Sequence, residues 1–103
     1  MIDTPISESA IIGAANGLAL SGKRPIAELM FADFIGVCLD QIWNQMGKFR
    51  YMFGGKTKCP AVIRMAYGAG FNAAAQHSQS VHSLLTALPG IKVVMPSTPA
   101  DVK

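Results

Sequence analysis

The chain has 103 residues, a length that predicts one small domain. Half of its residues are hydrophobic, 15% are charged and the mean hydropathy is +0.33, an unusually apolar balance for a small soluble chain. Such a composition indicates either a membrane protein or a protein whose apolar surface is covered by a partner. Charged residues interrupt each apolar stretch well short of the roughly 18 residues that a membrane span needs. We therefore expect no membrane span and favour a partner.

The net charge of +3 comes from nine Lys and Arg residues that are scattered along the chain. Since no aromatic residues interleave with them in a stacking pattern, we interpret them as solvated charges and expect no nucleic-acid binding. Cys38 and Cys59 lack the spacing of a metal site, which favours two core thiols in a reducing compartment. The absence of a recognisable signal peptide adds to the expectation of a cytoplasmic protein.

The first expected helix spans residues 5 to 20, with Thr4 as its cap and Pro5 in its first turn. Its many Gly and Ala residues leave room for another backbone or a ligand to come close. Glu8 lies near the positive end of the helix dipole, which favours the carboxylate, whereas apolar burial would favour the protonated form. Two interpretations of Glu8 remain open: it shares a proton with a ligand nitrogen, or it only complements the helix dipole at the surface.

Three short apolar runs, residues 24 to 31, 60 to 65 and 91 to 95, predict buried parallel strands. A helix is expected over residues 33 to 51 because apolar side chains recur there at spacings of three and four: Phe34, Val37, Cys38, Ile42, Met46 and Phe49. A shorter helix is expected over residues 80 to 88. This alternation predicts an α/β fold with a mainly parallel sheet between flanking helices, in three layers.

The last residues carry a clear helix start. Thr98 and Asp101 have the spacing of a capping box, and Pro99 occupies the first helical position. The sequence ends two residues later, so we expect residues 1 to 103 to be a truncated part of a longer domain.

The segment from residue 67 to 78 is rich in Gly and too long for a simple turn, and such loops tend to carry function. His77 lies in it, either as a structural or as a catalytic residue. His77 and His82 are five residues apart and lack nearby Cys or carboxylate partners, which argues against a metal site. The chain has no glycine-rich phosphate loop, and Ser78 and Ser80 lack the strand–Ser–helix elbow of a nucleophile.

Five motifs stand in order along the chain: Asp-Thr-Pro-Ile-Ser-Glu at 3–8, Asp33-Phe34 with Asp40-Gln41-Ile42, Tyr51-Met52-Phe53-Gly54-Gly55, Ala75-Gln76-His77-Ser78-Gln79, and Val93-Val94-Met95-Pro96-Ser97. Together they closely resemble the β subunits of thiamine-diphosphate-dependent 2-oxo acid dehydrogenases, including the pyruvate, acetoin and branched-chain members. The resemblance covers the whole chain. It identifies residues 1–103 as a truncated, transketolase-like pyrimidine-binding domain.

The resemblance implies roles for particular residues. In this family thiamine diphosphate lies between two subunits: the α subunit holds the diphosphate and magnesium, and the β subunit holds the aminopyrimidine. Glu8 matches the glutamate that hydrogen-bonds the pyrimidine nitrogen, Phe34 the aromatic residue stacked on the ring, and Met30 an apolar wall beside it. His77 matches the histidine that faces substrate and the incoming lipoyl group. Ala61 falls where the family uses a backbone carbonyl to bind a structural potassium ion.

The implied activity is oxidative decarboxylation of a 2-oxo acid with acyl transfer to a lipoyl group, for which this chain supplies half of the cofactor site. Because the phosphate-binding half belongs to an α subunit, we expect the isolated chain to be inactive. The alternative is a truncated domain without catalytic function that self-associates or acts as a binding module. In either case we expect the isolated chain to form homo-oligomers.

Overall fold

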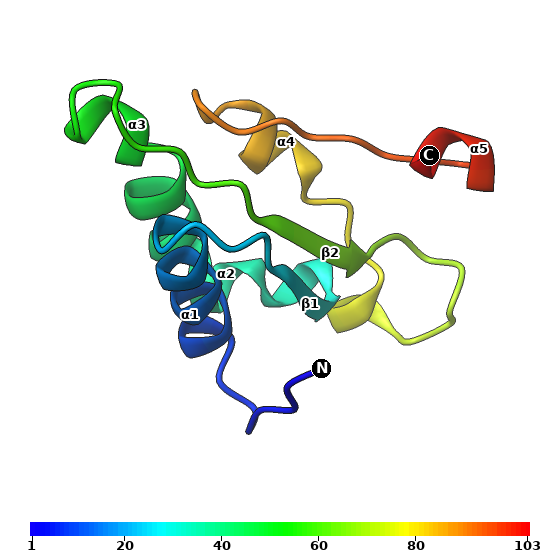
Figure 1. Cartoon of the computed structure of the whole chain (residues 1–103). Helices are drawn as coiled ribbons and strands as arrows, with labels where there is room; N and C mark the ends of the chain where they lie inside the picture. The colour runs from blue at the N-terminus through cyan, green and yellow to red at the C-terminus, as the bar shows by residue number, and fades with distance from the viewer.

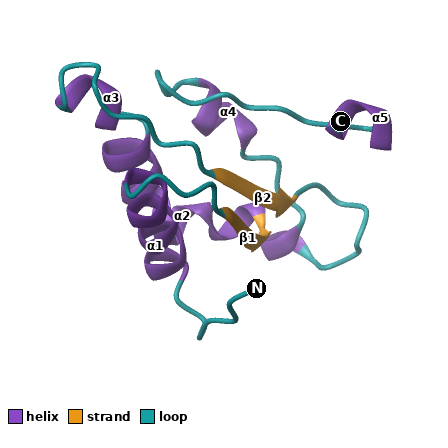
Figure 2. Cartoon of the chain, in the orientation of Figure 1, coloured by secondary structure: helices purple, strands orange, loops and turns teal.

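A computed structural model describes all residues from Met1 to Lys103. The chain forms two strands and a series of mostly short helices (Figures 1 and 2). In chain order these are α1 (Glu8–Leu20), β1 (Ile26–Phe31), the 3-10 helix η1 (Ala32–Phe34), α2 (Ile35–Asp40), the π-helix η2 (Gln41–Met46), α3 (Phe49–Met52), β2 (Val62–Ala66), the 3-10 helix η3 (Ala75–His77), α4 (His82–Thr86) and α5 (Pro99–Val102). The molecule measures 44 × 29 × 25 Å along its principal axes.

The two strands pair in parallel, which confirms the predicted α/β fold with a parallel sheet. On one face of the sheet, Ala27 lies opposite Ile63 and Leu29 lies opposite Met65. These side chains join the hydrophobic core beneath the helices. Because side chains alternate along a strand, the intervening residues point to the other face.

That other face is not covered by helices of this chain. Ile26 and Val62 face each other across the strands and are 72% and 55% exposed. Beside them Glu28 and Arg64 form an ion pair across the two strands. Residues 1–103 therefore supply one helical layer and a sheet, and the second face of the sheet is open.

The core lies where α1 packs against α2 and η2 and covers the strands (Figure 1). The largest fully buried side chains come from all of these elements: Ile12, Leu29, Ile35, Ile42 and Cys38. The apolar stripe predicted over residues 33 to 51 is therefore real, except that Val37 is 60% exposed. Buried Ala15 and Ala19 are small enough to let α1 lie close to its neighbours.

The first helix begins three residues later than predicted. Glu8 is its first residue, and Ser7 rather than Thr4 occupies the N-cap position, with no side-chain cap. The Ser7 hydroxyl donates instead to the Pro5 carbonyl at 3.2 Å. Since short polar side chains compete in this way with helical hydrogen bonds, Pro5 stays outside the helix.

The expected continuous helix from 33 to 51 is interrupted, and a side chain from α1 bonds its backbone at that point. The Asn16 amide donates to the Gln41 carbonyl at 2.8 Å. Gln41 is also the residue at which the regular i→i−4 pattern ends. The backbone then follows a π-helix, with the Gly47 N–H donating to the Ile42 carbonyl at 2.9 Å. Residues 49 to 52 resume as the separate helix α3.

The prediction of a third strand over residues 91 to 95 is wrong. Ile91 and Val93 pack on the core while Lys92 and Val94 are exposed, so the segment has a strand-like alternation. It forms no backbone ladder with β2. Parallel sheets are normally stabilised by burial of both faces, and here only one face is covered. The segment crosses beyond β2 toward the C-terminus (Figure 1).

The helix predicted over residues 80 to 88 is present with shorter bounds, as α4, and the predicted helix start at Thr98 opens α5. Leu85 in α4 and Leu88 just after it are buried in the core. At α5 the Thr98 hydroxyl accepts from the Asp101 N–H, and the Asp101 carboxylate accepts from the Thr98 N–H, which completes the capping box. Hydrogen bonds from Ser97 and Thr98 lower the pKa of Asp101. None of the helices has the length and apolar character needed to cross a membrane.

A close backbone contact joins the end of η2 to the turn after α4. Gly90 has a φ of +88°, and a Cβ at this position would lie 2.3 Å from the Gly47 carbonyl oxygen. Only glycine satisfies both conditions without strain.

We expect Gly90→Ala to destabilise the fold by about 2–4 kcal/mol, because the cost of a positive φ and the cost of the clash with the Gly47 backbone add up. Gly68 is the matched control: its φ is +89°, but a Cβ there would meet nothing within 4 Å. Gly68→Ala should cost only about 1 kcal/mol. Urea unfolding of the three proteins measures both values. Equal losses for the two variants would show that the Gly47 contact has no energetic role.

Candidate functional site at the carboxyl end of the sheet

The structure brings Glu8 and the start of α2 together. The Ser9 hydroxyl donates to the Val37 carbonyl at 2.7 Å, which fixes the first turn of α1 against α2. Since α2 follows β1 through η1, this contact lies near the carboxyl end of the sheet. Ligands of parallel α/β sheets bind at this end.

Glu8 is 8% exposed and makes no hydrogen bond or ion pair through its carboxylate within the chain. Its neighbour is Cys38, whose thiol donates to the Phe34 carbonyl at 3.7 Å. Burial raises the pKa of Cys38, a backbone hydrogen bond opposes this, and the negative charge of Glu8 raises it further. The fully buried polar atoms without a partner do not include the Glu8 oxygens, so the carboxylate keeps some accessible surface. Glu8 can therefore receive a hydrogen-bond donor from outside the chain.

Four aromatic rings gather beside η1. His77 is stacked on Phe31 with ring centroids 4.6 Å apart and meets Phe34 edge-on at 5.2 Å. Phe71 from the glycine-rich loop packs edge-on against Phe31 at 6.1 Å. The predicted functional loop is thereby folded onto the end of β1, and His77 and Phe34 become neighbours.

Asp33 holds this loop, a role that sequence reasoning did not assign. One carboxylate oxygen, Oδ1, accepts from the Gln79 backbone N–H at 3.2 Å. The other oxygen, Oδ2, is buried without a hydrogen-bond partner, and so is Nδ1 of His77. Buried polar atoms normally have partners, so two orphaned atoms on the adjacent elements η1 and η3 suit a polar ligand. The long separation between Asp33 and Gln79 in the chain explains why no local pattern revealed the bond.

The two other residues singled out from the sequence lie differently. Met30 is 47% exposed near the end of β1, where the pairing register shifts between Leu29 and Phe31, so it borders the candidate site rather than the core. Ala61 directly precedes β2, at the amino end of the sheet and away from the aromatic rings.

A second pair of polar side chains lies after the loop. The Ser80 hydroxyl and His82 Nδ1 are 2.9 Å apart, and Tyr67 packs edge-on against the His82 ring. No carboxylate orients this histidine, so the pair lacks the third member of a nucleophilic triad. The chain contains no cluster of three or more metal-ligating side chains.

If Asp33 fastens the loop that carries His77, Asp33→Ala should speed hydrogen–deuterium exchange of the Gln79 amide severalfold, because a charge-assisted bond is lost. Asp33→Asn retains an acceptor oxygen and should restore most of the protection. Asp40→Ala is the control, since the Asp40 carboxylate bonds only to Asn44, four residues further along the chain in η2. The exchange is measured by NMR. Unchanged Gln79 exchange in Asp33→Ala would contradict this role.

Comparisons with known proteins show which family the chain resembles. The family model of the transketolase pyrimidine-binding domain matches residues 1–103. The chain is 66% identical over all its 103 residues to the β subunit of acetoin:2,6-dichlorophenolindophenol oxidoreductase from Cupriavidus necator, of which it covers 30%. It is 48% identical to the 2-oxoisovalerate dehydrogenase β subunit and 43% identical to the pyruvate dehydrogenase E1 β subunit of Bacillus subtilis, each covered to 32%.

The chain thus spans about a third of the length of these curated relatives. The matches cover all of its residues, and they include the acetoin, branched-chain and pyruvate types that the sequence motifs suggested. This chain belongs to the transketolase pyrimidine-binding domain family, and its resemblance to the β subunits of 2-oxo acid dehydrogenases is confirmed.

Proposed function

We propose that residues 1–103 are one part of a larger pyrimidine-binding domain and supply half of a thiamine-diphosphate site to a 2-oxo acid dehydrogenase. The observation that carries the proposal is the placement of Glu8, buried and unpartnered, against the segment that carries Phe34. The family match and the β-subunit relatives support it. The acyl group would pass to a lipoyl group, and magnesium would be held by an α subunit.

The residues present fit an aminopyrimidine. A ring with polar edges and apolar faces needs a hydrogen-bonding carboxyl group and an aromatic surface, and Glu8 and Phe34 supply these. When bound, thiamine diphosphate would supply nucleophilic carbon chemistry toward a 2-oxo acid. The Glu8 carboxyl group would share a proton with a ring nitrogen and so tune the basicity of the ring. Met30, half-exposed at the border of the site, would form an apolar wall beside the ring.

His77 is proposed to face the substrate. Its stacking on Phe31 and edge contact with Phe34 fix the ring plane, and its Nδ1 has no partner within the chain. An imidazole held in this way can donate to or accept from a substrate oxygen. The proposal also includes a structural potassium ion at the Ala61 carbonyl, away from the reacting groups. It places the chain in the cytoplasm, where free thiols such as those of Cys38 and Cys59 persist.

Calorimetric titration with thiamine diphosphate tests this function. We expect binding when the chain is mixed with an α subunit of the acetoin type, and neither binding nor 2-oxo acid decarboxylation by the chain alone. Glu8→Gln should weaken binding in the mixture about tenfold, the value of one charge-assisted hydrogen bond. Glu28→Gln is the control, because Glu28 is exposed on the open sheet face. If the Glu8 and Glu28 variants bind thiamine diphosphate with equal affinity, Glu8 does not contact the cofactor and only complements the helix dipole.

A second candidate function, self-association without catalysis, is favoured by the open sheet face. Ile26 and Val62 form an exposed apolar surface, and the sheet has only two strands, so its edges are available for pairing. A second copy of the chain would cover both.

Sedimentation at micromolar concentration should therefore show a dimer or larger species. Val62→Lys places a charge on the open face and should shift the chain toward its monomer mass of 10.9 kDa. Val94→Lys is the control, because Val94 is 81% exposed on the segment after α4, outside the sheet. A monomeric wild-type chain at all concentrations would exclude self-association.

A further inference from the structure

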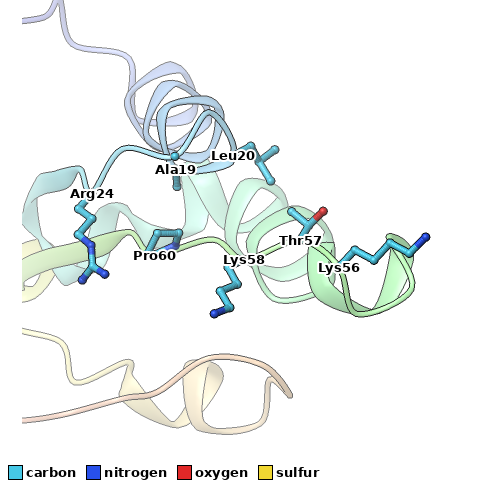
Figure 3. Close-up of a pocket in the computed structure, with 8 residues that line it drawn as sticks. Ala19, Leu20, Arg24, Lys56, Thr57, Lys58 and Pro60 are labelled. Carbon is cyan, nitrogen blue, oxygen red and sulfur yellow. The ribbon is translucent and has the colours of Figure 1, made fainter.

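A basic hollow of about 420 Å³ lies at the opposite end of the sheet from Glu8 and Phe34 (Figure 3). It is formed by the end of α1, the turn that leads into β1 and the segment that leads into β2. Three of its eight lining residues are cations, Arg24, Lys56 and Lys58, and none is acidic. The hollow is separate from the candidate cofactor site because its residues precede the amino ends of both strands, whereas that site follows their carboxyl ends.

The three cations have no counter-ion within the chain. The one ion pair in the structure joins Glu28 to Arg64, and the one hydrogen bond from a lysine side chain is that of Lys48 to Asn44. Arg24, Lys56 and Lys58 are all exposed. Like charges that line one concavity raise its positive potential and attract anions.

Capping of α1 does not explain these charges. Cations near a helix C-terminus can bond its last carbonyls. Here, however, backbone N–H groups do so: Ser21 donates to Gly17 and Lys23 to Leu18, at 3.0 and 2.9 Å. Gly22, with a φ of +89°, closes the turn by donating to Ala19 at 3.0 Å. The side chains of the hollow are therefore free to bind something else.

The arrangement of the side chains fits a phosphate group. Figure 3 shows Arg24 and Lys58 extending to the same side of the chain, with Pro60 between them, while Lys56 points away at the outer end. A guanidinium fork binds two phosphate oxygens at once, and an ammonium adds a point charge. Thr57 and Leu20 also line the hollow, on the other side of the chain from Arg24 and Lys58 (Figure 3), and Pro60 adds apolar surface between the two cations.

We propose that this hollow binds the phosphate group of a small phosphorylated metabolite, with Arg24 and Lys58 as the main contacts and Lys56 as a charge at the rim. The volume lies within the range of small-molecule sites, roughly 300–1,000 Å³. An acidic peptide would require a longer basic stripe. The apolar surface of Pro60, between Arg24 and Lys58, accommodates the part of the ligand beyond its phosphate.

NMR titration of the ¹⁵N-labelled chain tests the proposal with three probes: inorganic phosphate, adenosine 5′-monophosphate and adenosine. We expect saturable shifts of the amides of Arg24 and Lys56 to Lys58 with both phosphates and none with adenosine. The signals of Glu8 and Phe34 should not move, which separates this site from the proposed pyrimidine site.

Arg24→Gln and Lys58→Gln should each weaken phosphate binding about tenfold, as expected for loss of one charge-assisted contact. Lys56→Gln should have a smaller effect, and Lys92→Gln, which removes an exposed charge outside the hollow, should have none. Arg24→Lys keeps the charge but removes the fork. This variant should bind phosphate with intermediate affinity. It also tests the Arg24 contact if the NMR spectrum shows that Arg24→Gln is unfolded.

Three results would overturn the proposal. The first is shifts that do not saturate and spread over all lysines. The second is unchanged affinity in Arg24→Gln and Lys58→Gln. The third is binding of a hexaglutamate peptide in the hollow without binding of either phosphate, which would assign the site to acidic protein segments instead.

Discussion

One buried amide organises this small structure. Asn16 is 3% exposed and lies in the middle of α1. Its nitrogen donates to the Gln41 carbonyl, and its oxygen accepts from the Cys59 thiol at 3.8 Å. A single side chain thus connects the first helix, the π-helix and the segment that leads into β2. Because an unsatisfied buried amide costs about 1–3 kcal/mol, these three segments are held to one arrangement.

The same constraint separates the two ends of the molecule. With α1 fixed along the second helical segment, its first turn lies against α2 and its last turn lies near the start of both strands. Glu8 and the aromatic rings then share one end, and the basic hollow occupies the other. Each end depends on the packing of Ile12, Ala15 and Ala19 along α1. Ile12 and Ala15 lie outside both proposed sites, whereas Ala19 also lines the basic hollow.

Much of the fold and part of the candidate site could be predicted from local sequence patterns. Apolar runs located β1 and β2, and the Thr98–Asp101 spacing located α5. Patterns failed where a contact between distant residues decided the conformation. Gln41 begins a π-helix and accepts a hydrogen bond from Asn16, which lies 25 residues earlier. No periodicity within residues 33 to 51 contains that contact. The residues from 91 to 95 have strand composition but no ladder partner.

The candidate site shows the same division. Glu8, Phe34 and His77 were identifiable as members of ordered motifs, whereas the hydrogen bond from the Gln79 N–H to Asp33 requires the folded chain. The basic hollow was also missed. Arg24 and Lys58 are 34 positions apart in the sequence, so they appear as scattered charges until the two segments that precede the strands are placed side by side.

The ion pair between Glu28 and Arg64 has a further consequence for the open face of the sheet. The pair lies between apolar side chains that would otherwise form one continuous apolar surface. Burying these charges is costly unless each keeps a polar partner. Any protein layer that covers this face must therefore present polar groups, or leave water, directly above the pair. Charges placed on an exposed sheet discourage indiscriminate stacking. The pair thus disfavours contact with a wholly apolar surface and favours a surface that has a polar group at the matching position.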